Sequence, residues 1–472
     1  MKRVLTLDLL RGIAIIGVVL IHVLGIVFEE TTDILEADLK NLLEGNPISV
    51  GVPLIVLGVV ITFFGNFSGL FVMISAVGNC ISVHRQWHKL VSRGIHEKMV
   101  FRKVLGTQTI RGGLVYVFGF ISEGFLGNLL EGLFDDDIIL SEKMVNSFFL
   151  SNILHCIGVS IIVTSILYLL FLRMDIAQST MTYIMIAIII LIAAAHPFIR
   201  SWLEGLDYGD SFVPNNTPTE WPGNYIERGF WKNLLFIFLS PIIGRVFPLV
   251  PMFMCAAVGL IVAMNINEKT ITPEFIKRTA IAAGIIVLSG ILYGILLNST
   301  ETQDFEIARA KSIGWHTLIL GSEVFSLILM IYLIDFRKKT NKQIFIKHTL
   351  IFRRFGMISL TLWTLQYFTV VPLAIFEIAG WPVFDGGLNG WQVLVVLFCV
   401  FWFWHFIAWS WEKGGFKGSF EWMMVLVLSR GSTSADRMKI RSVLHEPEGF
   451  IEWIPGKKRR RKEEPVAGPS AL

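Results

Sequence analysis

Charged residues are scarce in this chain. Only 17% of its 472 residues are Asp, Glu, Lys or Arg, whereas 54% are hydrophobic, and the mean hydropathy is +0.64. Many apolar runs approach twenty residues, which is the length that a helix needs to cross a bilayer. No stretch of ordinary soluble composition is long enough to form a separate domain. We therefore predict an all-α protein that crosses a membrane many times.

Several motifs and patterns are absent from the sequence, and their absence excludes further classes of protein. The sequence has no strands of alternating polarity, which argues against a membrane β-barrel, and helices pair every backbone amide inside a bilayer. The net charge of +4 is too small to indicate a nucleic-acid partner. No phosphate-binding Gly-rich loop, dinucleotide-binding turn or serine elbow occurs, and the histidines lack metal-ligand spacing, so we expect no metal. The cysteines lie in apolar runs and are expected to be buried thiols: Cys80, Cys156, Cys255 and Cys399.

The distribution of Lys and Arg predicts the topology. Lys2 and Arg3 precede the first apolar run, basic loops follow at 85–103 and 337–354, and the tail carries a basic run at 457–462. Acidic loops alternate with these segments. Because basic loops stay on the cytoplasmic side, this alternation predicts about ten spans with the N- and C-termini in the cytoplasm.

The apolar runs divide the chain into a transmembrane bundle (1–412), an interfacial helix region (413–440) and a basic cytoplasmic tail (441–472). The second run is interrupted near 65–69, and both a single crossing and a crossing with a re-entrant half remain open. The expected spans are Leu5–Phe28, Ile48–Val83, Thr107–Leu130, Phe148–Leu172, Thr180–Pro197, Phe247–Ile266, Phe275–Leu297, Ser312–Asp335, Phe355–Glu377 and Trp391–Trp411.

The first span carries three ionisable residues. At about 100° per residue, Arg11 and His22 fall within roughly 20° of one another on a helix, and Asp8 lies about 40–60° from both. Ionisable groups inside a membrane are costly unless they face a partner or a wet cavity. We therefore predict that this face of the helix lines a functional site, and we call it the charged stripe. A structural alternative remains, in which Arg11 pairs with Asp8 and His22 is a hydrogen-bonded packing residue.

The predicted topology brings further groups to the depth of His22. His155 lies near the outer start of one span, Glu123 lies late in an outward span, and His196 lies at an outer helix end. Imidazole is a suitable general base near neutral pH, and a carboxylate can orient it. The planar fork of arginine suits phosphate or carboxylate. Other polar groups within spans are Glu323, Gln366, Tyr367 and His405.

The opening LDLLRGIAIIGVVLIH resembles the first helix of the transmembrane acyltransferase superfamily. Arg11 and His22 have the arginine-to-histidine spacing of its acyltransferase-three branch. Five later stretches are similar to the heparan-α-glucosaminide N-acetyltransferase catalytic-domain branch and its prokaryotic relatives, and they occur in the order that those proteins show. They are LFVMISAVG (70–78), NILHCIGVS (152–160), FPLVPMFMCAAVGL (247–260), FGMISLTLWTLQ (355–366) and FKGSFEW (416–422).

The resemblance implies a membrane-embedded acyltransferase. Such an enzyme takes an acyl group, usually acetyl, from cytoplasmic acyl-CoA and delivers it to a glycan or lipid-linked acceptor at the external face. It implies that Arg11, with Asp8 beside it, serves the donor. The catalytic candidates are His22, His155 and Glu123, with one histidine acting as base or as a transient acyl carrier.

The expected setting is the cytoplasmic (plasma) membrane. The expected partners are membrane lipids, acyl-CoA (acetyl-CoA first) and the acceptor, and a homodimer remains open. Two alternative functions also remain. One is a transporter or flippase of a polar or lipid-linked solute, which would use the charged stripe as a pathway. The other is a catalytically silent structural subunit of a membrane assembly.

Overall fold

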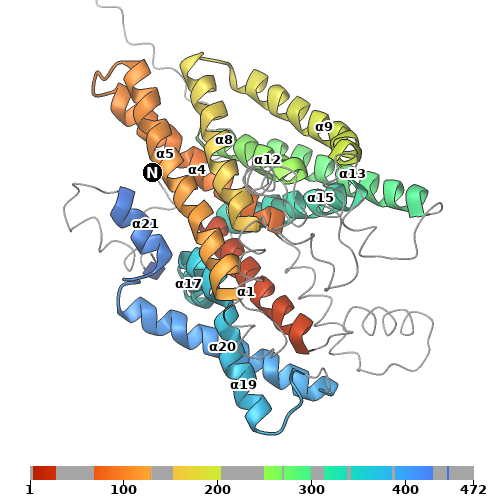
Figure 1. Cartoon of the computed structure of the whole chain (residues 1–472). Coiled ribbons are helices and arrows are strands. Elements are labelled where there is room, and N and C mark those ends of the chain that lie inside the picture. The colour runs from red at the N-terminus through yellow and green to blue at the C-terminus, as the bar shows by residue number, and fades with distance from the viewer. Residues whose placement is uncertain are drawn as a thin grey trace, which may run out of the picture.

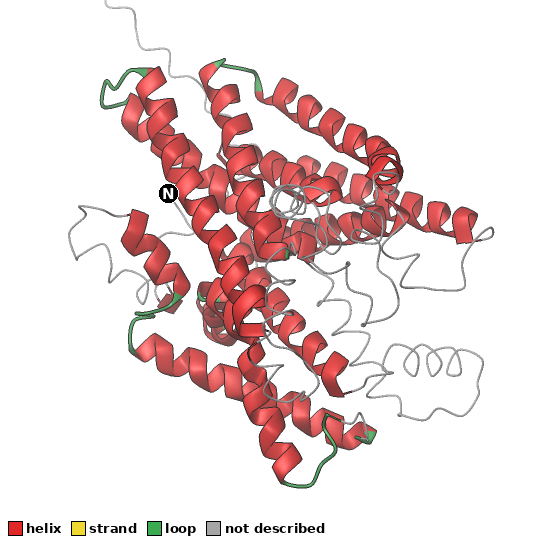
Figure 2. Cartoon of the chain, in the orientation of Figure 1, coloured by secondary structure: helices red, strands yellow, loops and turns green. Residues whose placement is uncertain are grey.

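The structure is a computed structural model, and it describes residues 4–27, 68–127, 129, 152–203, 249–267, 271–298, 313–336, 342–384, 388–428 and 444–445. Within these ranges every regular element is a helix (Figure 2). The elements are α1 (Leu5–Val27), α4 (Ser68–Val91), α5 (Glu97–Gly119), η1 (Phe120–Gly127), α8 (Ile153–Arg173), α9 (Gln178–Leu203), α12 (Leu249–Asn267), α13 (Pro273–Asn298), α15 (Ile313–Met330), η3 (Ile331–Phe336), α16 (Lys342–His348), α17 (Leu350–Met357), α18 (Ser359–Leu365), η4 (Gln366–Thr369), α19 (Val370–Ile378), α20 (Gly390–Lys413) and α21 (Phe420–Leu428).

The all-α prediction and the membrane prediction are confirmed. The described ranges contain nine helical segments long and apolar enough to cross a membrane, and each coincides with one of the predicted spans. The remaining predicted span, Ile48–Val83, is represented by α4, which is described from Ser68 onward. The choice between one crossing and a re-entrant half concerns residues 48–67, which lie outside the described residues.

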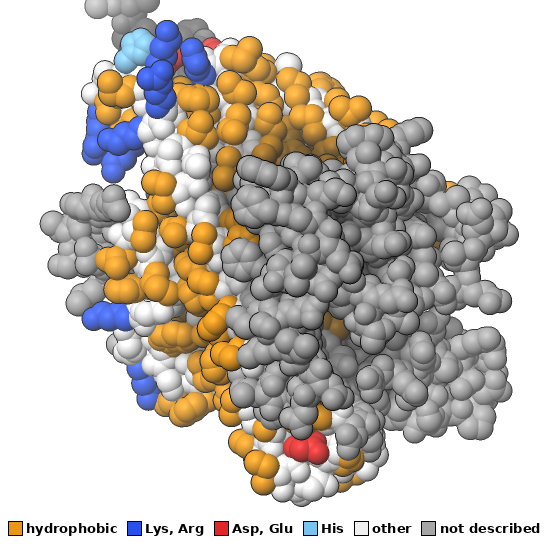
Figure 3. All heavy atoms as spheres, viewed as in Figure 1, with side chains coloured by type: hydrophobic (Ala, Val, Ile, Leu, Met, Phe, Trp, Pro, Cys, Tyr) orange, Lys and Arg blue, Asp and Glu red, His pale blue; other side chains and the backbone are white. Residues whose placement is uncertain are grey.

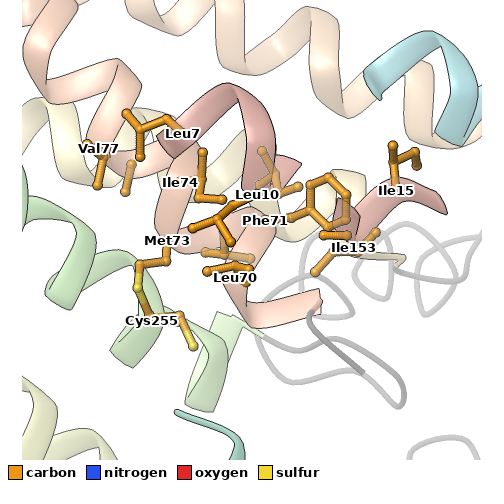
Figure 4. Close-up of a cluster of buried hydrophobic side chains, with 14 of the residues drawn as sticks. Leu7, Leu10, Ile15, Leu70, Phe71, Met73, Ile74, Val77, Ile153 and Cys255 are labelled. Carbon is orange, nitrogen blue, oxygen red and sulfur yellow. The ribbon is translucent and has the colours of Figure 1, made fainter. Parts of the chain in front are cut away.

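α4 and α12 lie at the centre of the bundle. α4 packs against α12, α8 and α1, and its Leu70, Met73, Ile74 and Val77 are fully buried (Figure 4). In the span of α12, 83% of the residues are buried, against 17% in α9 and in α13. α9 and α13 therefore form the outer layer (Figure 1), where exposed apolar side chains suit contact with lipid.

Two pairs of glycines let helix backbones touch. A Cβ atom on Gly12 of α1 would lie 1.7 Å from the carbonyl oxygen of Phe352, and one on Gly356 of α17 would lie 2.1 Å from the Asp8 carbonyl. Likewise, a Cβ on Gly112 of α5 would lie 2.5 Å from the carbonyl oxygen of Gly158 on α8. Small residues at helix crossings maximise van der Waals contact, which is the main packing force in a bilayer.

Asp335 of η3 anchors the beginning of α1. Its carboxylate oxygens accept hydrogen bonds from the backbone N–H groups of Leu5 and Thr6, both at 3.4 Å, and from the hydroxyl of Thr6. The first amides of a helix have no partner within the helix, and a negative charge there also complements the helix dipole. The chain segments near residues 5 and 335 are thereby joined at one end of the bundle.

The predicted span Phe355–Glu377 is broken twice. Ile358 separates α17 from α18 with non-helical backbone angles (φ −122°, ψ 31°). Further on, the chain tightens into the 3₁₀ turn η4 just before Pro372, whose ring excludes the carbonyl of the residue four positions earlier. Gln366 therefore lies at an irregular turn and not within a regular helix.

α21 closes over the first of these breaks. The carboxylate of Glu421 accepts hydrogen bonds from the N–H groups of Leu360, at 2.6 Å, and Thr361, at 3.3 Å, and from the Thr361 hydroxyl. That hydroxyl in turn accepts from the N–H of Phe420 at 2.8 Å. This interlocking joins two stretches that are about sixty residues apart in the chain. α21 lies within the region 413–440, for which an interfacial helix is predicted, and it contacts α5 and α18.

Basic side chains gather where α4 turns into α5 (Figure 3). All six of the basic residues near this turn are exposed, and one acidic residue, Glu97, lies among them. We call this surface the basic turn. It consists of Arg85, Lys89, Arg93, Lys98, Arg102 and Lys103.

Candidate functional site

A cavity of about 300 Å³ lies between α1, α4, α5, α8, α17, α18 and α21. Its volume is at the lower end of the range for small-molecule pockets. Most of its lining is apolar, with a few polar side chains, which is the usual composition of a ligand site. The lining residues are Arg11, Phe71, Ser75, Gly78, Asn79, Arg111, Val115, Leu154, Ile157, Ile161, Gly356, Met357, Ser359, Leu360, Trp363, Glu421, Met424, Val425 and Leu428.

Two guanidinium groups line this cavity. Arg11 comes from α1 and Arg111 from α5, and each directly precedes a glycine at a backbone contact, Gly12 and Gly112. The close helix crossings therefore determine where the two arginines lie. The single carboxylate in the lining, Glu421, is engaged by the amides at the start of α18. The cavity consequently carries a net positive charge that favours an anionic ligand.

The cavity lining also contains a hydrogen-bond acceptor and a donor with unfilled capacity. Asn79 donates through Nδ2 to the Ile161 carbonyl at 3.1 Å and to Ser165 Oγ at 2.8 Å, while its Oδ1 is buried and has no partner among the described residues. The indole Nε1 of Trp363 is likewise buried without a described partner. Both atoms are enclosed by the protein around the cavity, and unsatisfied buried polar atoms of this kind are rare and costly.

His22 makes one specific contact. Its Nδ1 lies 2.9 Å from Oε1 of Gln366, and part of the side chain remains exposed. Because an amide oxygen only accepts, Nδ1 carries the proton and donates it, and Nε2 keeps its lone pair. Gln366 thus fixes the tautomer in which the outer nitrogen of His22 is a base.

His155 has a different environment. It is 1% exposed, and its ring lies between those of Tyr116 and Phe120 with centroids 4.5 and 4.4 Å away. Its Nδ1 accepts the backbone N–H of Asn152 at 3.0 Å, and Asn152 Oδ1 accepts the N–H of His155 at 3.2 Å. This reciprocal pair is a capping box at the start of α8. The lone pair of Nδ1 is therefore already used.

Asp8 and His196 lie outside the cavity lining, and Glu123 cannot be placed relative to it. Asp8 is 7% exposed and lies at the α1–α17 crossing, one turn from Arg11. Glu123 is in the π-helical turn η1, and its side chain is outside the described residues. His196 lies beside His316, with ring centroids 5.8 Å apart. Of the predicted site residues whose side chains the structure describes, Arg11 lines the cavity, whereas Asp8, His22 and His155 do not.

Three residues of the cavity lining were not predicted as site residues from the sequence: Arg111, Asn79 and Trp363. Each lies within an apolar run, and only the packing of α5, α4 and α18 around one cavity brings them together. A signal existed for Arg111, because an arginine within a span is costly without a partner or cavity. For Trp363 the sequence carries no such signal, since tryptophans are common in membrane proteins.

The chain was compared with known proteins. No protein-family model matches it, and no curated protein matches it significantly. The fold and the cavity lining define a helical membrane protein with a cavity that carries two arginines and one glutamate.

Proposed function

We propose that this protein is a membrane-embedded acyltransferase. It moves an acyl group, acetyl first, from cytoplasmic acyl-CoA to a glycan or lipid-linked acceptor at the external face of the plasma membrane. The chain crosses that membrane about ten times with both termini in the cytoplasm. The observation that carries the proposal is that one cavity is lined by two guanidinium groups, those of Arg11 and Arg111.

The size and the charge of the cavity support acyl-CoA as the donor substrate. A cavity of about 300 Å³ suits the pantetheine arm and acyl group of acyl-CoA, with the nucleotide outside. Guanidinium groups bind phosphate bidentately. Lys103 of the basic turn is eight residues before Arg111, about 12 Å along α5, and would meet the remaining phosphates.

The transfer step uses His22. Arg11 and His22 are eleven residues apart on α1, about 16 Å along the helix, so a thioester anchored at Arg11 extends toward the outer half of α1. His22 Nε2 takes the proton of the acceptor hydroxyl or amine as that group attacks the thioester carbonyl. Gln366 holds the imidazole in the required tautomer. His155 then has a structural role, because its Nδ1 caps α8.

Calorimetric titration of the detergent-purified protein with acetyl-CoA and with CoA tests the donor site. We expect saturable binding that weakens about tenfold or more in Arg11→Ala and in Arg111→Ala, since hydrogen bonds to charged groups contribute about 1.5–3 kcal/mol. Arg278→Ala is the control, because Arg278 is exposed and pairs with Glu274 one turn away. Absence of binding by folded wild-type protein would refute the proposal.

One observation favours transport as a second candidate. Glu323 is fully buried in the span of α15, and its Oε2 accepts a hydrogen bond from the Cys255 thiol at 3.4 Å. A Cβ on Gly69 would lie 2.4 Å from this oxygen, so the carboxylate packs against the beginning of α4. Buried carboxylates beside helix ends occur in ion-coupled transporters. Uptake of a polar solute by proteoliposomes without CoA, lost in Glu323→Gln, would favour that function.

A further inference from the structure

Like-charged side chains lie one helical turn apart at two places in the basic turn. Arg85 and Lys89 are four residues apart on α4, and Lys98 and Arg102 are four residues apart on α5. Residues at this spacing are neighbours on a helix surface, and like charges there destabilise the helix. None of the six basic side chains pairs with a carboxylate of the described residues, and the only acidic residue among them is Glu97. An anion from outside the chain would therefore relieve this repulsion.

The basic turn lies at the level of the membrane surface in the predicted topology. Arg85 lies two residues beyond the end of a predicted span at Val83, about 3 Å along α4. Arg102 lies five residues before the next predicted span begins at Thr107, about 8 Å along α5. The headgroup layer on each side of a bilayer is about 5–8 Å thick. Both guanidinium groups therefore lie at the depth of the lipid phosphates on the cytoplasmic side.

Exposed apolar side chains accompany these charges. Met99 of α5 is 64% exposed, and Val91 of α4 is 37% exposed. The end of α8 lies beside the first turns of α5, since the Arg173 guanidinium lies over the ring of Phe101, 6.0 Å from its centroid (Figure 1). The next residue, Met174, is 67% exposed. Basic side chains beside exposed apolar ones are typical of surfaces that contact lipid, whereas a soluble anion would gain nothing from the apolar groups.

We propose that the basic turn binds the headgroups of anionic phospholipids in the cytoplasmic leaflet. The lipid phosphate oxygens accept hydrogen bonds from the guanidinium and ammonium groups, and the exposed methionines lie against the upper acyl chains. Clusters of about four to eight Lys and Arg residues next to a membrane span have the composition of such lipid sites. The proposal does not depend on acyl transfer, and it leaves Lys103 available for the phosphates of acyl-CoA.

The test compares phosphatidylglycerol with phosphatidylcholine of the same acyl chains. Native mass spectrometry of the detergent-purified full-length protein measures the dissociation constant of each lipid. We expect wild-type protein to prefer phosphatidylglycerol. The double variant Arg85→Gln/Lys89→Gln should lower that preference about tenfold or more, because each basic side chain near an anionic surface contributes about fivefold to the affinity.

The matched control is Lys277→Gln/Arg278→Gln. Both residues are exposed near the beginning of α13, and Arg278 pairs with Glu274. The control removes the same charge from the same predicted side of the membrane, but outside the basic turn. It should change the preference for phosphatidylglycerol less than threefold.

Thermal unfolding in lipid nanodiscs gives a second measurement. In phosphatidylcholine, Arg85→Gln/Lys89→Gln should melt at or above the wild-type temperature, because the substitutions remove a pair of like charges. In nanodiscs that contain phosphatidylglycerol it should melt below wild type, because the stabilising headgroup is lost. A purely structural role of the two side chains would shift the melting temperature in the same direction in both lipids.

Three results would overturn the proposal. The first is a wild-type protein without preference for phosphatidylglycerol, which would leave the basic turn to a soluble partner. The second is an equal preference in wild type and Arg85→Gln/Lys89→Gln. The third is displacement of phosphatidylglycerol by inorganic phosphate or CoA, which would make the turn a site for soluble phosphates. Absence of acetyl-CoA binding with the lipid preference intact would remove the proposed function alone.

Discussion

Two adjacent glycines of α5 provide a controlled test of the packing that positions Arg111. Gly112 faces α8, where a Cβ would lie 2.5 Å from the carbonyl oxygen of Gly158 and 2.7 Å from Cγ1 of Ile162. A Cβ placed on Gly113 would meet no neighbouring atom within 4 Å. Substituting each by alanine changes the helix propensity by the same amount, about 1 kcal/mol in favour of alanine. The difference between the two variants therefore isolates the packing cost.

The magnitude follows from the geometry. An ordinary contact begins at 3.4 Å, so α5 and α8 must separate by 3.4 − 2.5 = 0.9 Å to accept a Cβ on Gly112. A gap of 0.5–1 Å forfeits about a quarter to a half of the dispersion energy of the contacts across it. Overpacking of this kind costs about 1–3 kcal/mol. We expect Gly112→Ala to be less stable than Gly113→Ala by that amount.

Thermal unfolding in detergent measures the difference. A change of 1 kcal/mol shifts Tm by about 2–4 °C in chains of 150–250 residues and by less in longer ones, so the two variants should differ by a few degrees. Gly113→Ala should melt at or above the wild-type temperature. Because Arg111 moves with α5, Gly112→Ala should also bind acetyl-CoA more weakly than Gly113→Ala. Equal melting temperatures in the two variants would refute the backbone contact between α5 and α8.

Three further predictions concern individual side chains. Asp335→Asn should lower the free energy of unfolding by about 1 kcal/mol, because it removes the negative charge at the start of α1. The exposed control Glu274→Gln should change the free energy of unfolding by less than about 0.5 kcal/mol. Equal effects of the two substitutions would contradict the helix cap. His155→Gln should keep both stability and thiol release from acetyl-CoA, because Gln completes a capping box, and loss of release in folded protein would show a catalytic role. Glu421→Ala should speed amide hydrogen exchange at 360–361, whereas the control Glu377→Ala should speed exchange at 383–384; unchanged exchange at 360–361 would contradict the attachment of α21.

The candidate site shows where sequence reasoning reached its limit. Helical periodicity correctly placed Asp8, Arg11 and His22 along one helix, because residues on one helix keep a fixed angular relation. The predicted topology grouped His22 with His155 by depth alone. In the structure His155 caps α8 and His22 contacts Gln366, which lies 344 positions away in the chain. Depth gives the position of a residue only along the membrane normal. Two side chains touch only when their positions within the membrane plane match as well.

The break at Gly65–Gly69 illustrates a second limit. The sequence indicated an interruption there, because glycine and asparagine disfavour a continuous helix. It carried no information that Glu323, from a span more than 250 residues later, would pack against Gly69 at the beginning of α4. A local helix breaker is visible in the sequence, whereas the side chain that lies against the beginning of the following helix is decided by tertiary packing.

The sequence by itself determined that this protein is helical and membrane-spanning, because the length of an apolar run and the need to pair backbone amides are local properties. It also determined which helix carries Arg11 and His22. Only the tertiary structure decided that Arg111, Asn79 and Trp363 share a cavity with Arg11, and that Gln366 is the partner of His22. Those relations depend on helix crossings such as Gly12 with α17 and Gly112 with α8, where two backbones approach closely enough to set the position of the neighbouring side chains.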